Sequence, residues 1–168
     1  MELRQELPDH PLPDEVRYRQ AVATIRVEGL VAQPMTLDAA ALRNLRQVAF
    51  EEPFVCDEGW AVPGLRWRGV ALHDALALAQ PLEQARFVSV CSGAYAVSVP
   101  VTDAPRILLC DTLNELPLPI EHGGPWRMVV PSGQCFTSVK WVERLEVTAE
   151  RKPSTGELIA RQRLSSAR

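Results

Sequence analysis

Apolar residues in this chain come in short runs, and each run ends at a proline, a glycine or a polar turn. The 168 residues include 14 prolines and 9 glycines, which interrupt helices and central strands alike. No run approaches the roughly 20 apolar residues that a membrane-spanning helix needs. Many short elements joined by long loops are typical of a β-rich α+β domain.

Alternating apolar and polar residues predict the strands, and helix-forming residues behind a capping residue predict two short helices. The expected strands are 22–29, 48–56 with a bend at Pro53, 66–70 (a strand or a turn), 87–91, 95–101, 106–110, 128–130 and 140–148. The expected helices are 39–45, with Thr36 as N-cap, and 71–79. We expect residues 1–20 to form an extended arm, 21–149 the core domain, and 150–168 a polar tail that frays.

Composition and charge exclude several classes of protein. The 18 basic and 21 acidic residues give a net charge of −3, which provides no general attraction to nucleic acid or an anionic membrane. A hydrophobic content of 46% and a charged content of 23% exclude a disordered chain, a collagen-like chain and a coiled coil. The acidic, proline-containing N-terminus lacks the features of a secretory signal, so we expect a cytoplasmic protein.

Four cysteines are spread along the chain, and no two of them form a CxxC pair. This spacing disfavours a zinc finger or a thioredoxin-type site. In a reducing cytosol the default for each is a buried, unpaired cysteine. The default is strongest for Cys91 and Cys110, because apolar residues crowd both of them.

Cys56 is the first residue with possible chemistry, within FVCDEGW (54–60). It closes a predicted strand and enters a glycine-containing loop, where a thiolate can act as a nucleophile or a soft-metal ligand. The neighbouring Asp57 and Glu58 raise the pKa of such a thiol and disfavour a nucleophile, whereas a bound metal would deprotonate it. The alternative is a buried structural cysteine.

A Gly-Gly-Pro loop lies within HGGPWR (122–127). Its glycines allow the backbone to approach a neighbour closely. His122 and Arg127 could then converge on a phosphate, which a guanidinium binds through two parallel hydrogen bonds. The alternative is a solvated loop in which Arg127 pairs with a surface acid.

Small polar residues and one cation precede the last predicted strand, in PSGQCFTSVKW (131–141). Gly133, Thr137 and Ser138 offer donors beside Lys140, and such a segment can bind an anion through successive backbone amides. The alternative is an ordinary lead-in to a strand, with the Lys140 side chain extending along apolar surface to water.

Six segments in the same order and with matching spacing resemble the molybdopterin-binding oxidoreductase domain of the sulfite oxidase family. The resemblance covers residues 22–148 and implies that family's fold, a β-rich α+β mixed-sheet or barrel-like domain with a few short helices. The segments are ATIRVEGLVAQPMTLDAAAL (23–42), FVCDEGW (54–60), WRGVALHDAL (67–76), SGAYAVSVP (92–100), HGGPWRMVVP (122–131) and SVKWVERLEV (138–147).

The resemblance implies a role for six residues. Cys56 matches the family cysteine whose thiolate ligates molybdenum and is the implied catalytic residue. A soft thiolate suits a metal that is already bound by the soft dithiolene sulfurs of molybdopterin. The positions that match the binding of the pterin and its phosphate are His122, Arg127, Ser138, Val139 and Lys140.

Three features depart from the sulfite-oxidising members. Residues 14–22 lack their Arg-Asn segment, for which Arg17 and Arg19 are poor substitutes. No tyrosine follows Trp141, and the S-x-D-G-Y turn lacks its aspartate at 92–95. These departures disfavour sulfite as the substrate but leave the cysteine and the phosphate-binding positions intact.

The resemblance therefore implies a molybdopterin-dependent oxidoreductase that transfers an oxygen atom or reduces an oxide on a small substrate. The sequence shows no haem motif or flavin fingerprint, so a separate electron-transfer partner is expected. The alternative is a binding or scaffold module that retains the fold without the cofactor.

Overall fold

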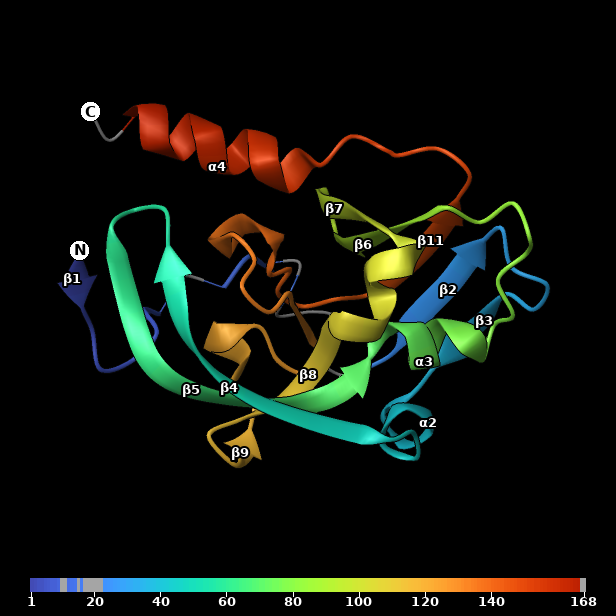
Figure 1. The fold of residues 1–168 in the computed structure, drawn as a ribbon, viewed down its shortest axis with the longest axis horizontal. Helices are drawn as coiled ribbons and strands as arrows, with labels where there is room; N and C mark the ends of the chain where they lie inside the picture. The colour runs from blue at the N-terminus through green and yellow to red at the C-terminus, as the bar shows by residue number, and fades with distance from the viewer. Residues whose placement is uncertain (10–11, 15, 17–22, 167–168) are drawn as a thin grey trace.

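Two β-sheets, flanked by short helices, account for most of the structure (Figure 1). This computed structural model describes residues 1–9, 12–14, 16 and 23–166. Strands outnumber helices among these residues, which confirms the β-rich α+β fold expected from the sequence. None of the helices in these ranges combines the length and the apolar character needed to cross a membrane.

The first sheet is built around a long hairpin of β4 and β5, with β5 pairing also to β1 and β8, and β8 to β9 and β10. The register of the hairpin shifts between Glu52 and Phe54, which confirms the expected bend at Pro53, a residue that cannot donate to the ladder. The predicted strand 66–70 is only the second half of β5. The strands of this sheet are β1 (Glu2–Leu3), β4 (Gln47–Cys56), β5 (Trp60–Ala71), β8 (Leu108–Leu113), β9 (Leu116–Pro117) and β10 (Arg127–Val129).

The second sheet has the strand order β3-β2-β11-β6-β7. Its last strand in sequence begins at Arg144 rather than at residue 140. The reason is that the amides of Trp141 and Val142 donate instead to the carbonyls of Gly123 and Trp126. The strands of this sheet are β2 (Ile25–Gly29), β3 (Met35–Leu37), β6 (Phe87–Ser92), β7 (Tyr95–Pro100) and β11 (Arg144–Thr148).

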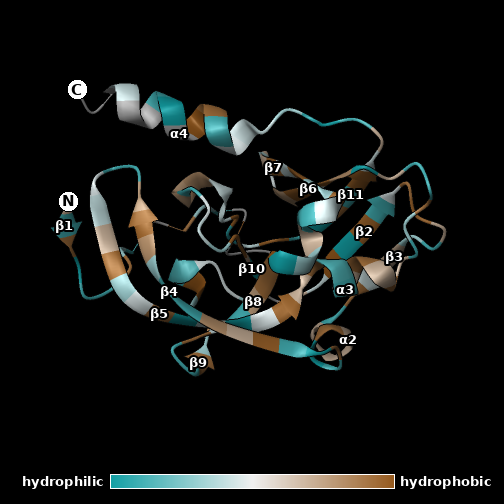
Figure 2. Cartoon of the chain, viewed as in Figure 1, coloured by the Kyte–Doolittle hydropathy of each residue, from teal (hydrophilic) through white to brown (hydrophobic). Residues whose placement is uncertain are grey.

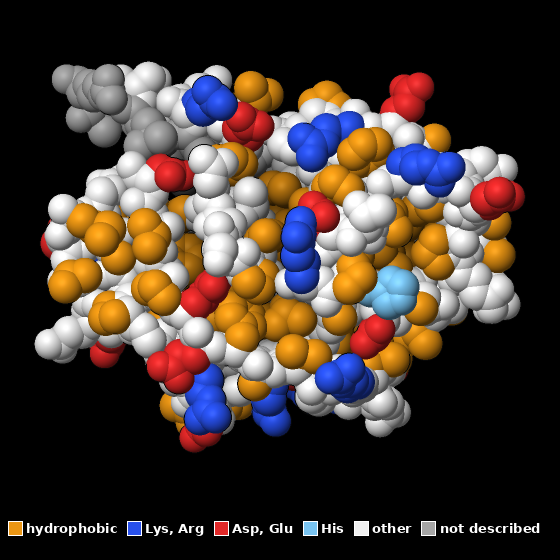
Figure 3. All heavy atoms as spheres, in the orientation of Figure 1, with side chains coloured by type: hydrophobic (Ala, Val, Ile, Leu, Met, Phe, Trp, Pro, Cys, Tyr) orange, Lys and Arg blue, Asp and Glu red, His pale blue; other side chains and the backbone are white. Residues whose placement is uncertain are grey.

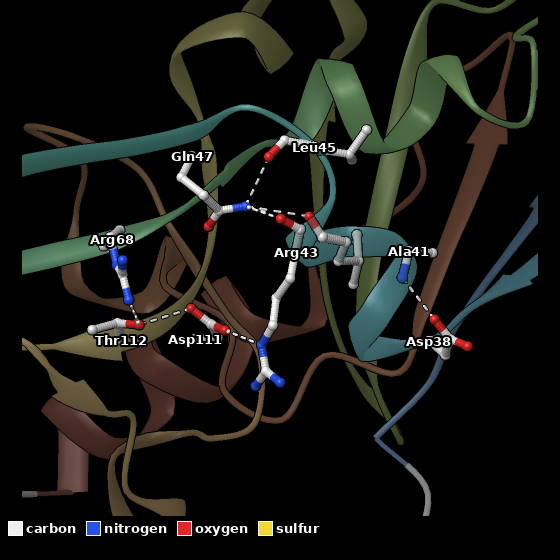
Figure 4. Close-up of polar contacts among 9 residues, drawn as sticks. Asp38, Ala41, Arg43, Leu45, Gln47, Arg68, Asp111 and Thr112 are labelled. Carbon is white, nitrogen blue, oxygen red and sulfur yellow. Dashed lines mark hydrogen bonds and ion pairs between the residues drawn. The ribbon is translucent and has the colours of Figure 1, made fainter.

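The two predicted helices are α2 (Ala39–Arg43) and α3 (Leu72–Ala77), and a 3₁₀ helix, η1 (Val101–Arg106), follows β7. The expected N-cap of α2 was wrong. Asp38 caps this helix by accepting from the amide of Ala41 at 2.7 Å (Figure 4). Thr36 lies instead in β3. A carboxylate two residues closer to the helix takes the place of the expected hydroxyl.

The C-terminal tail was expected to fray, but residues Thr155–Ser166 form helix α4, which lies along the side of the molecule near β7 (Figure 1). The Thr155 hydroxyl accepts from the amide of Ala96 at 2.8 Å and donates to the carbonyl of Ala94 at 2.7 Å. These bonds tie the start of α4 to the edge of the second sheet. The boundary expected at residues 20–21 lies outside the described residues, as do Arg17 and Arg19.

The core has two hydrophobic clusters, and strands β8 and β10 contribute to both because successive side chains point to opposite faces. Leu109 and Met128 belong to the cluster under the second sheet. Cys110 and Val129 belong to the cluster inside the β4–β5 hairpin, whose strands alternate hydrophilic and hydrophobic residues (Figure 2). By the same alternation, Arg127 faces the hairpin cluster.

Candidate functional site

Two thiols meet at the end of β4. Cys56 is the last residue of that strand, and its Sγ lies 3.2 Å from the Sγ of Cys135, which opens the 3₁₀ helix η3 (Cys135–Thr137). The hydrogen bond with Cys135 lowers the pKa of Cys56 to about 7 and raises the pKa of Cys135. Burial and the charges of Glu58 and Asp57 raise the pKa of Cys56, as expected, but the neighbouring thiol outweighs them.

Sequence reasoning missed Cys135, although it lies within the segment 131–141. The chain offers no CxxC spacing to mark the pair, because 79 residues separate the two cysteines. Cys91 and Cys110 are buried and free, as predicted. Burial raises the pKa of both, so Cys56 differs electrostatically from the cysteines that are merely structural.

Arg127 is a buried cation among aromatic rings. Its guanidinium carbon lies 5.0 Å from the ring centre of Phe54 and 5.1 Å from that of Trp67. Its side chain donates to the carbonyl of His122 at 2.9 Å, and its buried Nε has no partner among the described residues. The alternative of an exposed arginine is wrong, because Arg127 is only 3% exposed.

The carbonyls of the 3₁₀ helix η2 (Ile120–His122) accept hydrogen bonds from three side chains. Trp141 Nε1 donates to the carbonyl of Ile120 at 2.7 Å, and Lys140 Nζ donates to that of Glu121 at 2.8 Å. Arg127 donates to the third carbonyl. A helix end with free carbonyls attracts cations. These hydrogen bonds to η2 bring the predicted segments 122–127 and 138–141 together.

The Gly-Gly pair keeps this loop close to its neighbours, as expected from the sequence. Gly123 has a φ of +106°, and a Cβ there would lie 2.8 Å from Cγ of Lys140. A Cβ on Gly124 would lie 2.2 Å from the carbonyl oxygen of Leu118. Side chains at either position would push the loop away and displace Lys140.

The electrostatics of the site favour an anion. Burial lowers the pKa of Arg127 to about 10 and that of Lys140 to about 8, and the charge of Arg127 further lowers the latter. Both groups are therefore mainly charged at neutral pH. Burial and then the charge of Lys140 lower the pKa of His122, whose buried Nδ1 has no partner among the described residues. Cations held close together with unpaired donors bind an anion at little further desolvation cost.

Ser138 and Val139 have different surroundings. Val139 is fully buried in the cluster under the second sheet, and its carbonyl accepts from the amide of Met128 at 2.8 Å. Ser138 is half-buried and lines a cavity of about 270 Å³ between β4 and the loop before η3. The other lining residues are Glu52, Pro53, Phe54, Val55, Val129, Val130, Ser132 and Gly133.

The protein surface shows no comparable concentration of one charge on the face drawn in Figure 3, where acidic and basic side chains are intermingled with apolar ones. His73 in α3 is exposed. The candidate site residues instead lie at the end of β4, at the start of β10 and in the loop before β11.

Comparison with known proteins adds three findings. Residues 11–156 match the family model described as the oxidoreductase molybdopterin binding domain. The nitrate reductase [NADPH] of Fusarium oxysporum is 29% identical over 153 residues, which covers 74% of this chain but only 17% of that protein. The sulfane dehydrogenase SoxCD of Paracoccus pantotrophus has a similar fold, with a TM-score of 0.71 at 21% identity, over 76% of this chain and 38% of that one.

Proposed function

The chain belongs to the oxidoreductase molybdopterin-binding domain family, and from that premise we propose that it is a molybdopterin-dependent oxidoreductase with Cys56 as the protein ligand of molybdenum. When bound, the cofactor supplies two-electron chemistry, either oxygen-atom transfer or the reduction of an oxide. The protein residues hold the cofactor, set its charge environment and exclude water around it.

One observation carries the proposal: Arg127 is buried with an Nε that has no partner among the described residues. A buried donor without a hydrogen bond costs about 1–3 kcal/mol, and more when it is charged. A phosphate would supply the missing acceptor and neutralise the charge. Arg127 therefore fits the phosphate of the cofactor.

The neighbouring groups fit the same ligand. Lys140 adds a second positive charge, and the unpaired Nδ1 of His122 can bond to a polar atom of the pterin or its phosphate. Ser138 lines the adjacent cavity and offers a hydroxyl. The side chain of Val139 lies in the core, so its proposed contribution is to hold the backbone between Ser138 and Lys140.

Cys56 fits the metal. Its pKa of about 7 leaves a large thiolate fraction at neutral pH, and the thiolate is the form that ligates metals. The ring of Trp60 stacks on that of Phe54 with centres 6.0 Å apart, and Phe54 lies beside Arg127. These aromatic residues give the buried cation apolar surroundings.

For the substrate and the electron-transfer partner, we propose only a chemical class. We propose a small molecule as substrate and an electron carrier outside residues 1–168, since these residues contain no haem or flavin motif. The chain spans 17% of the length of the nitrate reductase described above, so the activity of that whole protein is not assigned to this chain. The cytoplasmic location stays a prediction.

The test is the content of molybdenum and pterin in protein purified from a host that makes the cofactor. We expect about one molybdenum per chain, released pterin fluorescence in the same ratio, and loss of the metal in Cys56→Ala. Cys91→Ala is the matched control, because Cys91 is also buried but lies in the second sheet. Protein without molybdenum from such a host would favour the cofactor-free binding module.

A further inference from the structure

The pair formed by Cys56 and Cys135 has a geometry that a metal ligand alone does not require. Their sulfurs lie 3.2 Å apart, and a disulfide bond is about 2.05 Å long. A further approach of little more than 1 Å would therefore join them. Cys56 ends a strand, whereas Cys135 begins the short 3₁₀ helix η3 in the connection between β10 and β11, so the two thiols come from separate segments of the chain.

We propose that Cys56 and Cys135 form a redox-active dithiol, which closes to a reversible disulfide. The other two cysteines offer no competing partner. Cys110 is fully buried in β8, in the same hydrophobic cluster as Cys56, and Cys91 lies in the second sheet, where its Sγ is 3.6 Å from the carbonyl of Ser89. Among the described residues, the sulfurs of Cys91 and Cys110 have no second thiol as a hydrogen-bond partner.

The oxidant is a low-molecular-weight disulfide such as oxidised glutathione. One protein thiol attacks its S–S bond, which breaks and releases one reduced thiol, and a mixed disulfide forms. The second protein thiol then attacks the protein sulfur of the mixed disulfide and releases the second reduced thiol. The two protein sulfurs lose two electrons, the reagent gains them, and the two protons pass to the released thiols.

Access to the pair comes from the loop side. Cys135 is half-buried rather than buried, and the cavity of about 270 Å³ lies next to the segments that carry the two cysteines, although neither cysteine lines it. Its lining includes Phe54 and Val55 from the end of β4, and Gly133 from the loop before η3. Cys135 is therefore the more accessible residue of the pair.

The disulfide would have a consequence for the site, and this part of the inference rests on the proposed function. A sulfur atom held in a disulfide is no longer a thiolate, and the thiolate is the form that ligates a metal. Oxidation of the pair would therefore prevent molybdenum from binding to Cys56, and reduction would restore binding. The chain would accept its cofactor only in a reducing environment.

The experiment uses the wild-type chain without cofactor, equilibrated in glutathione buffers from fully reduced to fully oxidised. Free thiols are then alkylated, and the intact and digested protein is weighed by mass spectrometry. We expect two of the four cysteines to lose reactivity together, a linked peptide containing Cys56 and Cys135, and full recovery with a reductant. Alkylation of all four in the most oxidised buffer, or a link to Cys91 or Cys110, would overturn the proposal.

Variants separate this proposal from the proposed function. Cys135→Ser should lose the disulfide, so its molybdenum content should no longer differ between reduced and oxidised preparations, whereas Cys91→Ser should show the same redox dependence as the wild type. If the disulfide forms but Cys56→Ser still binds molybdenum, the dithiol stands and the ligand assignment fails. If Cys56 is needed for molybdenum but no disulfide forms, the ligand assignment stands and the dithiol fails.

Discussion

Gly123 lies so close to Lys140 that a Cβ on the glycine would be 2.8 Å from Cγ and 2.9 Å from Cβ of the lysine. This approach holds the aliphatic part of Lys140 in place while its Nζ donates to the carbonyl of Glu121. The left-handed backbone at Gly123 and the position of the cation therefore depend on each other. The loop that contains Gly123 and the segment before β11 that contains Lys140 therefore hold the lysine ammonium group in place together.

Gly123→Ala tests this relationship. We expect a loss of about 2–3 kcal/mol in the free energy of unfolding, because the new methyl group meets Lys140 and the positive φ is strained. Gly59→Ala is the control, since Gly59 has a φ of +91° but no atom within 4 Å of its Cβ position. That variant should lose only about 1 kcal/mol. If urea unfolding shows an equal loss of unfolding free energy in both variants, the contact with Lys140 does not contribute to the stability.

Cys135→Ala should raise the pKa of Cys56. The hydrogen bond between the two thiols is the largest cause of the pKa of about 7, and burial and the nearby carboxylates would then act unopposed by it. A pKa near 9 instead of 7 reduces the thiolate fraction at pH 7 from about one half to about one hundredth. The measurement is the pH dependence of alkylation of the Cys56 peptide. An unchanged titration in Cys135→Ala, with Cys91→Ala as control, would contradict the expected coupling.

Arg127→Met separates the role of the buried cation in binding from its role in stability. Removing the charge relieves its desolvation but loses one hydrogen bond and two aromatic contacts, so we expect the free energy of unfolding to change by less than about 1.5 kcal/mol. The pterin content should fall at least about tenfold, as a loss of about 1.4 kcal/mol or more implies. Arg144→Met, which removes a partly exposed arginine paired with Glu28, should keep the pterin. Loss of more than about 3 kcal/mol would assign Arg127 a structural role instead.

His122 should make the protein less stable in acid. Its pKa in the folded state is lowered by burial and by Lys140, so the unfolded chain binds the proton more readily. The penalty is absent well above the unfolded pKa of about 6.5 and grows as the pH falls below it. Urea unfolding at pH 7.5 and pH 5.5 should show a smaller acid-induced loss in His122→Gln than in the wild type. The same loss in both, or an equal effect of His73→Gln on the exposed face of α3, would refute the assignment.

Local features of the sequence anticipated several elements correctly. Alternation placed strands β2, β4, β6 and β7, and Pro53 marked the irregularity in the hairpin. Helix-forming residues placed α2 and α3, although the N-cap Asp38 was missed because several capping residues compete before the helix. The full length of β5 was missed, because its first half depends on pairing with β4 rather than on its own pattern.

The candidate site also has features that follow from local sequence and features that depend on the tertiary structure. The sequence by itself determined which residue types are available and that the Gly-Gly pair permits a close approach at Gly123, because propensity, periodicity and motif spacing involve neighbours along the chain. The grouping of Cys56 with His122, Arg127 and Lys140 came from the family resemblance and not from a local pattern. Only the tertiary structure decided that Arg127 is buried without a partner for its Nε and that Cys135 contacts Cys56 across 79 residues. These contacts depend on the register of the sheets and on the path of the loops between them. No local pattern encodes a distance between residues so far apart in sequence.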